Sequence, residues 1–536
     1  MARAKTRTRS RGSGSRRGGR EAELERIRRR LARETGTLAL GQPAAVCLAY
    51  PSPYHVGMSS LGFQTLYRIL NAEGPGCHRA FLPDEWERMA LPWPQPKRPI
   101  LSYEGERPIS DYPIIGISVA YELEVSGLIR LLEGAGIPLL AADRGPRDPI
   151  IIGGGPLTNS NPSVILPFVD LMIAGEAEGL LPEAVATILD TRGRRAAIDA
   201  AGQLPHTIRG EVDPGHFEPL PDMAKGPELY LPAHSAIVTP DTELSDMFLV
   251  EPERGCSRRC TFCVMRGGTT GGMRLLDKEV PLALVPEHAK KVGLVGAAVT
   301  DHPQLEELVA RIVERGKGIG VSSLRADRLT PGLLRNLAAG GYRTITVASD
   351  GISERMRKVL DRRITEESIL RAAKLIAAEG FHRMKVYEMM GAPGETDADA
   401  DEVVRFALEL AKINRLTLTF STFTAKRNTP LDGAPFIGVK AAEARLDRIK
   451  RGLKGKVEVR PQPPKWAYVE YLIAQRGPEV GHAAIEAVHA GARYRDWLSA
   501  IEPLPPSERS LRFGDEWLRA RRTGKAASRP RLPVVT

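Results

Sequence analysis

Residues 247–263 read MFLVEPERGCSRRCTFC, an apolar stretch that runs directly into three closely spaced cysteines. Residues 247–251 have the continuous apolar pattern of a buried strand. Cys256, Cys260 and Cys263 then place three thiols within eight positions of the following loop. Thiolates are soft ligands that favour iron-sulfur clusters, zinc or copper over hard cations. The stretch therefore predicts a metal centre just beyond the carboxyl end of a strand.

The identity of the metal depends on whether a fourth ligand is close. A structural zinc site needs four ligands, usually Cys or His. The only other cysteines, Cys47 and Cys77, lie far upstream, and the nearest downstream histidine, His288, is poorly placed to close the site. Three cysteines with no obvious fourth ligand suit a cubane cluster that keeps one iron open for a substrate or cofactor. We therefore expect an iron-sulfur cluster, with zinc as the alternative.

Strands and helices alternate on both sides of the cysteine loop, which predicts an α/β fold. Upstream, apolar strands separated by amphipathic helices indicate a doubly wound parallel sheet covered on both faces. Downstream, six strand-helix units fit a partial or complete (β/α) barrel, in which chemistry sits at the carboxyl ends of the strands. The six predicted barrel strands are residues 247–251, 292–299, 319–323, 344–348, 384–389 and 416–420.

The chain of 536 residues is longer than one hydrophobic core usually supports, so several domains are expected. Composition and periodicity divide it into six segments. We predict a basic disordered tail at 1–35, a doubly wound domain at 40–200, a connector at 201–245, a barrel at 246–440, a helical cap at 441–503 and a basic, largely disordered tail at 504–536.

The net charge of +11 is concentrated at the two ends of the chain. Residues 1–30 hold twelve Lys/Arg against three Glu, and residues 505–536 hold eight Lys/Arg against three acidic residues, which leaves the body at −3. Any attraction to nucleic acid is therefore expected only through the tails. Five cysteines are too few, and three of them are too close together, for the disulfide framework of a secreted protein. A reducing cytoplasm is therefore expected. The sequence contains no run of eighteen or more apolar residues, so no membrane span is predicted.

The cysteine spacing and the strand series resemble the radical S-adenosylmethionine superfamily. In that family the open iron of a 4Fe-4S cluster is chelated by the amino and carboxylate groups of the methionine moiety, and reductive cleavage yields a 5′-deoxyadenosyl radical. The resemblance implies that Cys256, Cys260 and Cys263 hold such a cluster, and that Phe262 lies in the S-adenosylmethionine site. It assigns no catalytic acid, base or radical-quenching residue.

The resemblance also implies ligand contacts after the second barrel strand. Gly296 and Ala297 stand where the family commonly has a Gly-Gly-Glu-like segment that grips the methionine amino group, but this sequence lacks the Glu. The backbone carbonyls of these two residues are then expected to bind the methionine amino group. The alternative is that the two residues only form a tight turn after the strand.

Later strand ends carry further implied contacts with S-adenosylmethionine. Ser323 and Asp350 follow the third and fourth strands, where the family often has a polar or acidic residue near the ribose or carboxylate. A helix N-cap at Asp350 or Ser353 is the alternative interpretation. Gly391 and Gly394 lie in a turn that resembles the family's adenine-binding turn.

The upstream domain resembles the cobalamin-binding-like domain of a large radical subfamily, in its uncharacterised branch. The resemblance rests on residues 50–62, YPSPYHVGMSSLG, and on two glycine-containing strand ends. Such strand ends border the ligand crevice in doubly wound folds. His55 lacks the spacing of a histidine cobalt ligand, so the sequence leaves cobalamin open. The implied crevice residues are Gly153, Gly154, Gly155, Gly175 and Glu176.

The resemblance implies an enzyme that cleaves S-adenosylmethionine and modifies an unknown substrate, with methyl transfer if the first domain binds cobalamin. Its implied partner is an electron donor such as flavodoxin or ferredoxin. One alternative is a methylthiotransferase acting on RNA or protein, although the chain shows no second cysteine triad and no carboxyl-terminal RNA-binding barrel. The other is a non-catalytic iron-sulfur sensor or scaffold.

Overall fold

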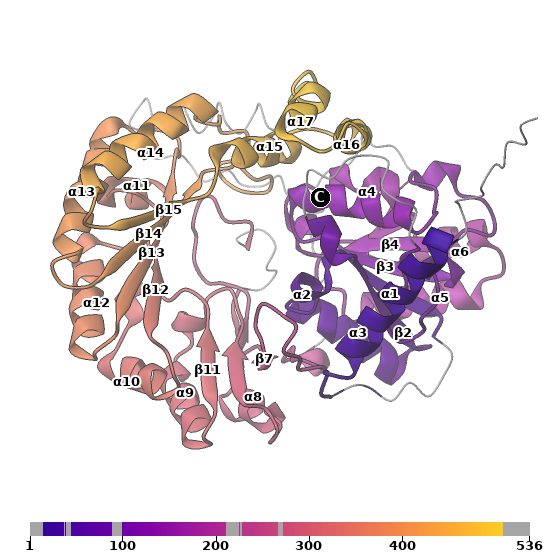
Figure 1. Cartoon of the computed structure of the whole chain (residues 1–536), viewed down its shortest axis with the longest axis horizontal. Coiled ribbons are helices and arrows are strands. Elements are labelled where there is room, and N and C mark those ends of the chain that lie inside the picture. The colour runs from indigo at the N-terminus through magenta and orange to yellow at the C-terminus, as the bar shows by residue number, and fades with distance from the viewer. Residues whose placement is uncertain are drawn as a thin grey trace, which may run out of the picture.

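The computed structural model describes residues 14–36, 38, 44–87, 99–210, 225, 228–265 and 272–507. These residues form a first α/β domain and a barrel-like second domain, which lie side by side (Figure 1). The last helices run from the barrel back to the first domain. The predicted fold class is confirmed.

The first domain is built on a six-stranded sheet with the order β2-β1-β3-β4-β5-β6. Its strands are parallel except for β6, which runs antiparallel at the edge. The order 2-1-3-4-5 is that of flavodoxin-like folds, which bind ligands where the order reverses, beside the carboxyl ends of β1 and β3. The strands are β1 (Val46–Pro53), β2 (Cys77–Leu82), β3 (Ile114–Ser118), β4 (Ile150–Gly154), β5 (Leu171–Ile173) and β6 (Thr207–Arg209).

Helices cover both faces of this sheet, which explains why its strands are continuous apolar runs. One face packs against α4, and the other packs against α1, α3, α5 and α6. The short α2 follows β1 directly. The bounds are α1 (Gly14–Leu31), α2 (Tyr54–Gly57), α3 (Leu61–Glu73), α4 (Val125–Gly134), α5 (Leu180–Asp190) and α6 (Arg194–Ala201).

The described part of the amino-terminal segment is largely helical, so the predicted disorder of residues 1–35 is wrong there. Ile27 of α1 is 1% exposed and lies in the core of the first domain. Arg30 on the same helix pairs with Asp84 and donates to Tyr103. Because the domain supplies acidic and apolar partners, this basic stretch docks as a helix instead of staying solvated.

The second domain carries seven parallel strands in its described part. The sheet β11-β10-β7 and the sheet β12-β13-β14-β15 are joined by a parallel bridge between Leu324 and Val347. The result is a partial barrel. Its strands are β7 (Met247–Val250), β10 (Lys291–Leu294), β11 (Gly318–Val321), β12 (Thr344–Ala348), β13 (Arg383–Met390), β14 (Leu416–Thr422) and β15 (Glu458–Pro461).

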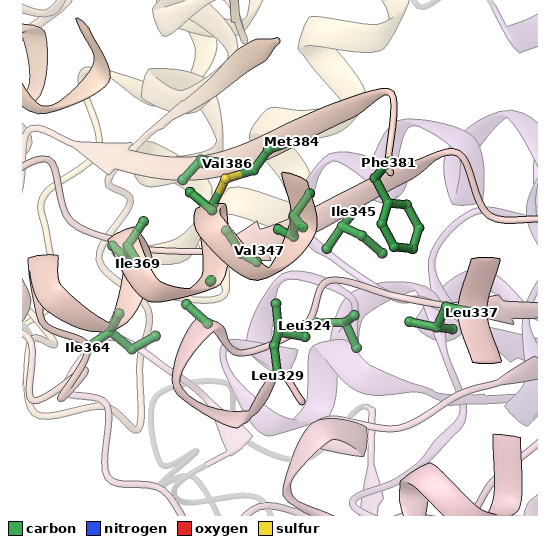
Figure 2. Close-up of a cluster of buried hydrophobic side chains, with 14 of the residues drawn as sticks. Leu324, Leu329, Leu337, Ile345, Val347, Ile364, Ile369, Phe381, Met384 and Val386 are labelled. Atoms are coloured by element: carbon green, nitrogen blue, oxygen red, sulfur yellow. The ribbon is translucent and has the colours of Figure 1, made fainter. Parts of the chain in front are cut away.

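The outer face of the barrel strands packs against the surrounding helices. Figure 2 shows part of this core, in which Ile345 of β12 and Met384 and Val386 of β13 belong to one cluster with helix side chains such as Ile369. Alternate residues of β13 therefore face the helices. The barrel helices are α8 (Glu279–Leu284), α9 (Leu305–Glu314), α10 (Pro331–Ala339), α11 (Glu354–Val359), α12 (Glu366–Ala378), α13 (Asp397–Leu410) and α14 (Val439–Leu453).

The segment predicted as a helical cap at 441–503 divides between the two domains. Most of α14 and all of β15 belong to the barrel. The helices α15 (Pro464–Ala474), α16 (Glu479–His489) and α17 (Tyr494–Ile501) pack into the core of the first domain instead, with Trp497 completely buried.

The predicted start of the connector differs from the structure, and the predicted tails lie partly outside the described residues. The first sheet continues to Arg209, beyond the predicted bound at residue 200. Residues 1–13 and 508–536 lie outside the described residues, so most of the predicted carboxyl-terminal tail does too. Within the described residues, no helix combines the length and apolar character needed to cross a bilayer.

Candidate metal and ligand site at the barrel mouth

Parallel strands bring the predicted S-adenosylmethionine contacts to one edge of the barrel. Ala297 lies three residues after β10, Ser323 two residues after β11, and Asp350 two residues after β12. Gly391 follows β13 directly. Because carboxyl ends of neighbouring parallel strands lie together, these positions line one mouth.

The cysteine loop is fixed at this mouth by backbone and apolar contacts. The Thr261 amide donates to the Leu360 carbonyl at 3.0 Å, and the Cys263 amide donates to the Cys260 carbonyl at 3.3 Å. The ring of Phe262 is half-buried against an apolar cluster at the ends of β13 and β14. Phe262 therefore holds the loop against the barrel, whatever further contact it makes.

The three thiols differ in burial. Cys260 is 7% exposed, and Cys256 and Cys263 are half-buried. Burial raises the pKa of the Cys256 and Cys263 thiols, so they ionise only where positive charge stabilises the thiolate, as a bound metal does. Among the described residues, no three His, Cys, Asp or Glu side chains already converge as ligands of a single ion. The donor set itself, three thiols on one loop, fits an iron-sulfur cluster.

Arg362 connects the cysteine loop to Asp350. Its Nη1 lies 4.0 Å from the Cys260 sulfur, and its Nε lies 2.8 Å from the Asp350 carboxylate. Burial raises the pKa of Asp350, and the positive charge of Arg362 opposes that rise. Asp350 has a φ of 56°, a left-handed conformation that Asp tolerates better than most residues. The predicted ligand residue is thus held by an arginine that also faces a cluster cysteine.

The alternative role of Asp350 as an N-cap is excluded, because Ser353 caps α11. The Ser353 hydroxyl accepts from the Met356 amide at 3.0 Å and donates to the buried Asp399 at 2.6 Å.

Replacing Ser353 by alanine removes both of these bonds. We expect a loss of about 1–2 kcal/mol of unfolding free energy, measured as a lower urea midpoint. Ser322→Ala, at an exposed serine, is the control and should leave the midpoint within about 0.5 kcal/mol. Equal midpoints for the two variants would show that the cap contributes nothing.

Gly296 lies against a buried carboxylate. Glu253 is fully buried, and its Oε1 accepts from the Ala298 amide at 2.7 Å. A Cβ at position 296 would lie 2.2 Å from this oxygen, so a larger residue there would have to displace the carboxylate. Burial raises the pKa of Glu253 to about 7. Ala297, in the turn that carries this amide, is exposed.

The turn after β13 has two glycines in the left-handed region. Gly391 and Gly394 both have a φ of 83°, a conformation that other residues rarely adopt. Glu395 closes the turn by accepting from the Gly391 amide at 2.8 Å, and Arg445 holds that carboxylate at 2.7 Å. Gly391 is buried, and a Cβ there would meet the Ile437 side chain at 2.9 Å, whereas Gly394 is exposed and a Cβ there would meet nothing within 4 Å.

The predicted crevice residues of the first domain lie at its carboxyl edge. Gly153 and Gly154 end β4, and Gly155 follows with a φ of 101°. A Cβ at Gly155 would meet the Val119 carbonyl at 2.6 Å, so this strand end requires glycine. Gly175, after β5, is similarly left-handed with a φ of 100°.

Glu176 takes part in a contact between the domains. Its carboxylate pairs with Arg254 at 3.3 Å and also with Arg274. Glu178 pairs with Arg254 at 2.6 Å. Both arginines belong to the short hairpin of β8 (Glu253–Arg254) and β9 (Arg274–Leu275), which begins just before the cysteines. The first domain therefore clamps the base of the cysteine loop.

Sequence patterns did not identify Glu253 or Lys426 as candidate site residues. Lys426 follows β14 and pairs with Glu122 of the first domain. Each is a single charged residue in a loop or at a strand end, with no spacing to distinguish it from solvated neighbours. Only the position of Glu253, three residues before Cys256, gives a hint.

A doubly wound domain ahead of a partial barrel, with three thiols on the loop after the first barrel strand, defines an α/β-barrel enzyme with a thiol-bearing mouth. Residues 62–207 match the family model for the N-terminal part of radical SAM proteins, and residues 250–407 match that of the radical SAM superfamily. The chain belongs to the radical S-adenosylmethionine superfamily, as predicted.

Three known proteins are similar over large parts of the chain. An uncharacterised protein of Methanocaldococcus jannaschii is 25% identical over 424 residues, 76% of this chain and 83% of that one. The ribosomal protein uS12 methylthiotransferase RimO of Kineococcus radiotolerans is 27% identical over 259 residues, 44% of this chain and 52% of that one. The radical S-adenosylmethionine methyltransferase TsrM of Kitasatospora setae, solved with cobalamin and a 4Fe-4S cluster, shares the fold at a TM-score of 0.50 and 18% identity, over 74% of this chain and 78% of that one.

Proposed function

We propose that this protein is a radical enzyme that binds a 4Fe-4S cluster through Cys256, Cys260 and Cys263 and cleaves S-adenosylmethionine. The observation that carries the proposal is the position of the three thiols at the barrel mouth, beside the strand ends. The three cysteines would hold the cluster, which would supply the one electron that is needed to cleave S-adenosylmethionine at the S–C5′ bond into methionine and a 5′-deoxyadenosyl radical. That radical would remove a hydrogen atom from the substrate. An external one-electron donor such as flavodoxin or ferredoxin supplies the electron.

The chain's own residues position the ligand in this proposal. Asp350, held by Arg362, offers carboxylate oxygens near the ribose. The turn at Gly391 and Gly394 admits the adenine ring close to the backbone. Ser323 and the turn at Gly296 and Ala297 complete the mouth, with Phe262 supporting the cysteine loop.

Cobalamin in the first domain belongs to the same proposal, with methyl transfer as the reaction. The support is the flavodoxin-like strand order and the glycine-containing strand ends, which line the edge where such folds bind ligands. TsrM, which shares the fold, binds cobalamin. A reducing cytoplasmic setting is part of the proposal, because the cysteines that bind the cluster must not be oxidised to disulfides.

Anaerobic purification with iron, sulfide and corrinoid analysis tests the proposal. We expect roughly four irons per chain, broad visible absorption, and 5′-deoxyadenosine after reduction in the presence of S-adenosylmethionine. A cluster with no cleavage under any reductant would favour the sensor alternative. Protein that contains no cluster after reconstitution would refute the proposal. Protein that contains a cluster but no corrinoid would refute only the part that concerns methyl transfer.

Methylthiolation remains a second candidate because of the likeness to RimO. The two cysteines outside the loop, Cys47 and Cys77, are fully buried in the first sheet, so this chain offers no second set of three. Transfer of a methylthio group to ribosomal protein or RNA in vitro would favour this candidate over methyl transfer.

A further inference from the structure

Glu253 is a fully buried carboxylate with an unused oxygen. Its Oε1 accepts from the Ala298 amide, whereas its Oε2 is buried without a hydrogen-bond partner among the described residues. A buried acceptor that lacks a donor costs about 1–3 kcal/mol, and more when it is charged. Such a group needs a partner that the described part of the chain does not supply.

The neighbouring carboxylates are already paired with arginines. Glu251 accepts from Arg254 at 2.8 Å, and Asp301 accepts from Arg258 at 2.6 Å. No arginine or lysine forms an ion pair with Glu253 in the described residues. Glu253 therefore differs from the acidic residues beside it, because it has no arginine or lysine partner among the described residues.

The unpartnered carboxylate oxygen of Glu253 lies at the barrel mouth. It precedes Cys256 by three residues and lies against Gly296, at the end of β10. A Cβ at position 296 would displace the carboxylate as it is placed, so glycine at this position leaves room for Glu253. This differs from the sequence-based expectation that Gly296 offers its carbonyl to the ligand.

We propose that Glu253 binds the amino group at the methionine end of S-adenosylmethionine. The inference rests on the proposed function, because that function supplies the ligand. An unused carboxylate oxygen requires an N–H or O–H donor. The proposed function already places the ribose hydroxyls at Asp350 and the adenine at the turn of Gly391 and Gly394. The sulfonium has no such hydrogen, which leaves the amino group of the methionine end as the donor. The carboxylate that this sequence lacks after β10 is thus supplied by the segment before the cysteines.

Binding measurements on anaerobically reconstituted protein test this assignment. Dissociation constants are measured by equilibrium dialysis for S-adenosylmethionine, for S-adenosylhomocysteine, which lacks the sulfonium charge, and for 5′-methylthioadenosine, which lacks the amino acid end. We expect Glu253→Gln to weaken the first two by roughly 30-fold or more and to leave the third unchanged. Glu133→Gln is the control, because burial also raises the pKa of Glu133, which lies in the last turn of α4 in the other domain. It should leave all three constants unchanged.

Each other pattern overturns the assignment. Loss confined to S-adenosylmethionine would make the sulfonium the partner, and equal loss for all three ligands would make Glu253 merely structural. Unchanged binding in Glu253→Gln, with normal binding by the wild type, would refute this inference and leave the proposed function standing. A wild type that binds a cluster but no S-adenosylmethionine would refute both.

A second variant covers the case in which Glu253→Gln does not retain the cluster. Gly296→Ala places a methyl group against Oε1 and displaces the carboxylate without removing it. It should reproduce the selective loss of S-adenosylmethionine and S-adenosylhomocysteine. Gly62→Ala, where an added Cβ meets nothing within 4 Å, is its control. Iron content and thermal midpoint are recorded for every variant.

Discussion

Cys260→Ala is expected to abolish the iron-sulfur cluster and, with it, the cleavage of S-adenosylmethionine. Cys260 is the most buried of the three thiols and lies in the middle of the loop, next to Arg362. A cluster with two remaining thiolates loses one of its three protein anchors, and thiolates are the ligands that hold such clusters. Iron and sulfide content, visible absorption and 5′-deoxyadenosine should all fall to background.

The control for this variant is another buried cysteine. Cys47→Ala removes a thiol of the first sheet that is as inaccessible as any in the chain and lies far from the loop in sequence. It should retain iron, absorption and turnover, with only a modest loss of stability. Full iron content in Cys260→Ala would contradict the ligand assignment. Loss of iron in both variants would point to misfolding of the chain as the cause.

The order and class of the elements were predictable because the strands of both domains, apart from the edge strand β6, are parallel and mostly buried. Strands such as β3 and β4 are continuous apolar runs, and the periodicity changes clearly between strand and helix. The cysteine loop was predictable for a different reason, since three thiols at close spacing are rare outside metal sites. Both signals are local, so the sequence carries them directly.

The elements that were missed or misplaced depend on long-range partners. β15 has the sequence EVRP, with two charged residues in four, and it forms a strand only because β14 offers an edge. The helix α1 is basic along most of its length, and it docks because acidic residues such as Asp84 face it. Neither partner can be assigned before the fold is known.

The same limit applies to the candidate site. Asp350 could be either a cap or a ligand residue on sequence grounds, and the alternatives separate only when Ser353 is seen to cap the helix. Gly296 could be assigned to a strand end from the sequence, but its contact with Glu253 could not, because Glu253 comes from another strand. Strand-end positions can be read from a sequence, whereas contacts between two strand ends require the structure.

Lys426→Met is expected to destabilise the contact between the domains by about 3–5 kcal/mol. The Lys426 ammonium pairs with Glu122 of the first domain, in the 3-10 turn Glu122–Glu124, and with Glu470 of α15 at 2.6 Å. Removal of the cation leaves two carboxylates facing each other in a buried interface. Urea unfolding at pH 8 measures the loss, and Lys412→Met, at an exposed lysine, is the control.

The loss should depend on pH, with a sign that follows from the pKa shifts. Burial disfavours the charged form of Lys426, but Glu122 and Glu470 more than compensate and raise its pKa. The wild-type pair therefore stabilises the fold while Lys426 is charged and its carboxylate partners are ionised. The lysine contribution is present in full below the ordinary lysine pKa and is lost as the pH rises through the raised pKa. Burial raises the pKa of Glu470, and Lys426 opposes that rise.

Without Lys426, the pKa of Glu470 rises further, and the folded variant holds a proton that the unfolded chain releases. Stability of Lys426→Met should therefore fall as the pH increases from about 4.5 toward neutrality, so the difference from wild type is smaller at pH 5 than at pH 8. Adding Glu122→Gln should recover part of the loss at pH 8, because one of the two unpaired carboxylates is gone. A difference that stays constant between pH 5 and pH 8, or a double variant no more stable than the single one, would show that packing and not charge sets the effect.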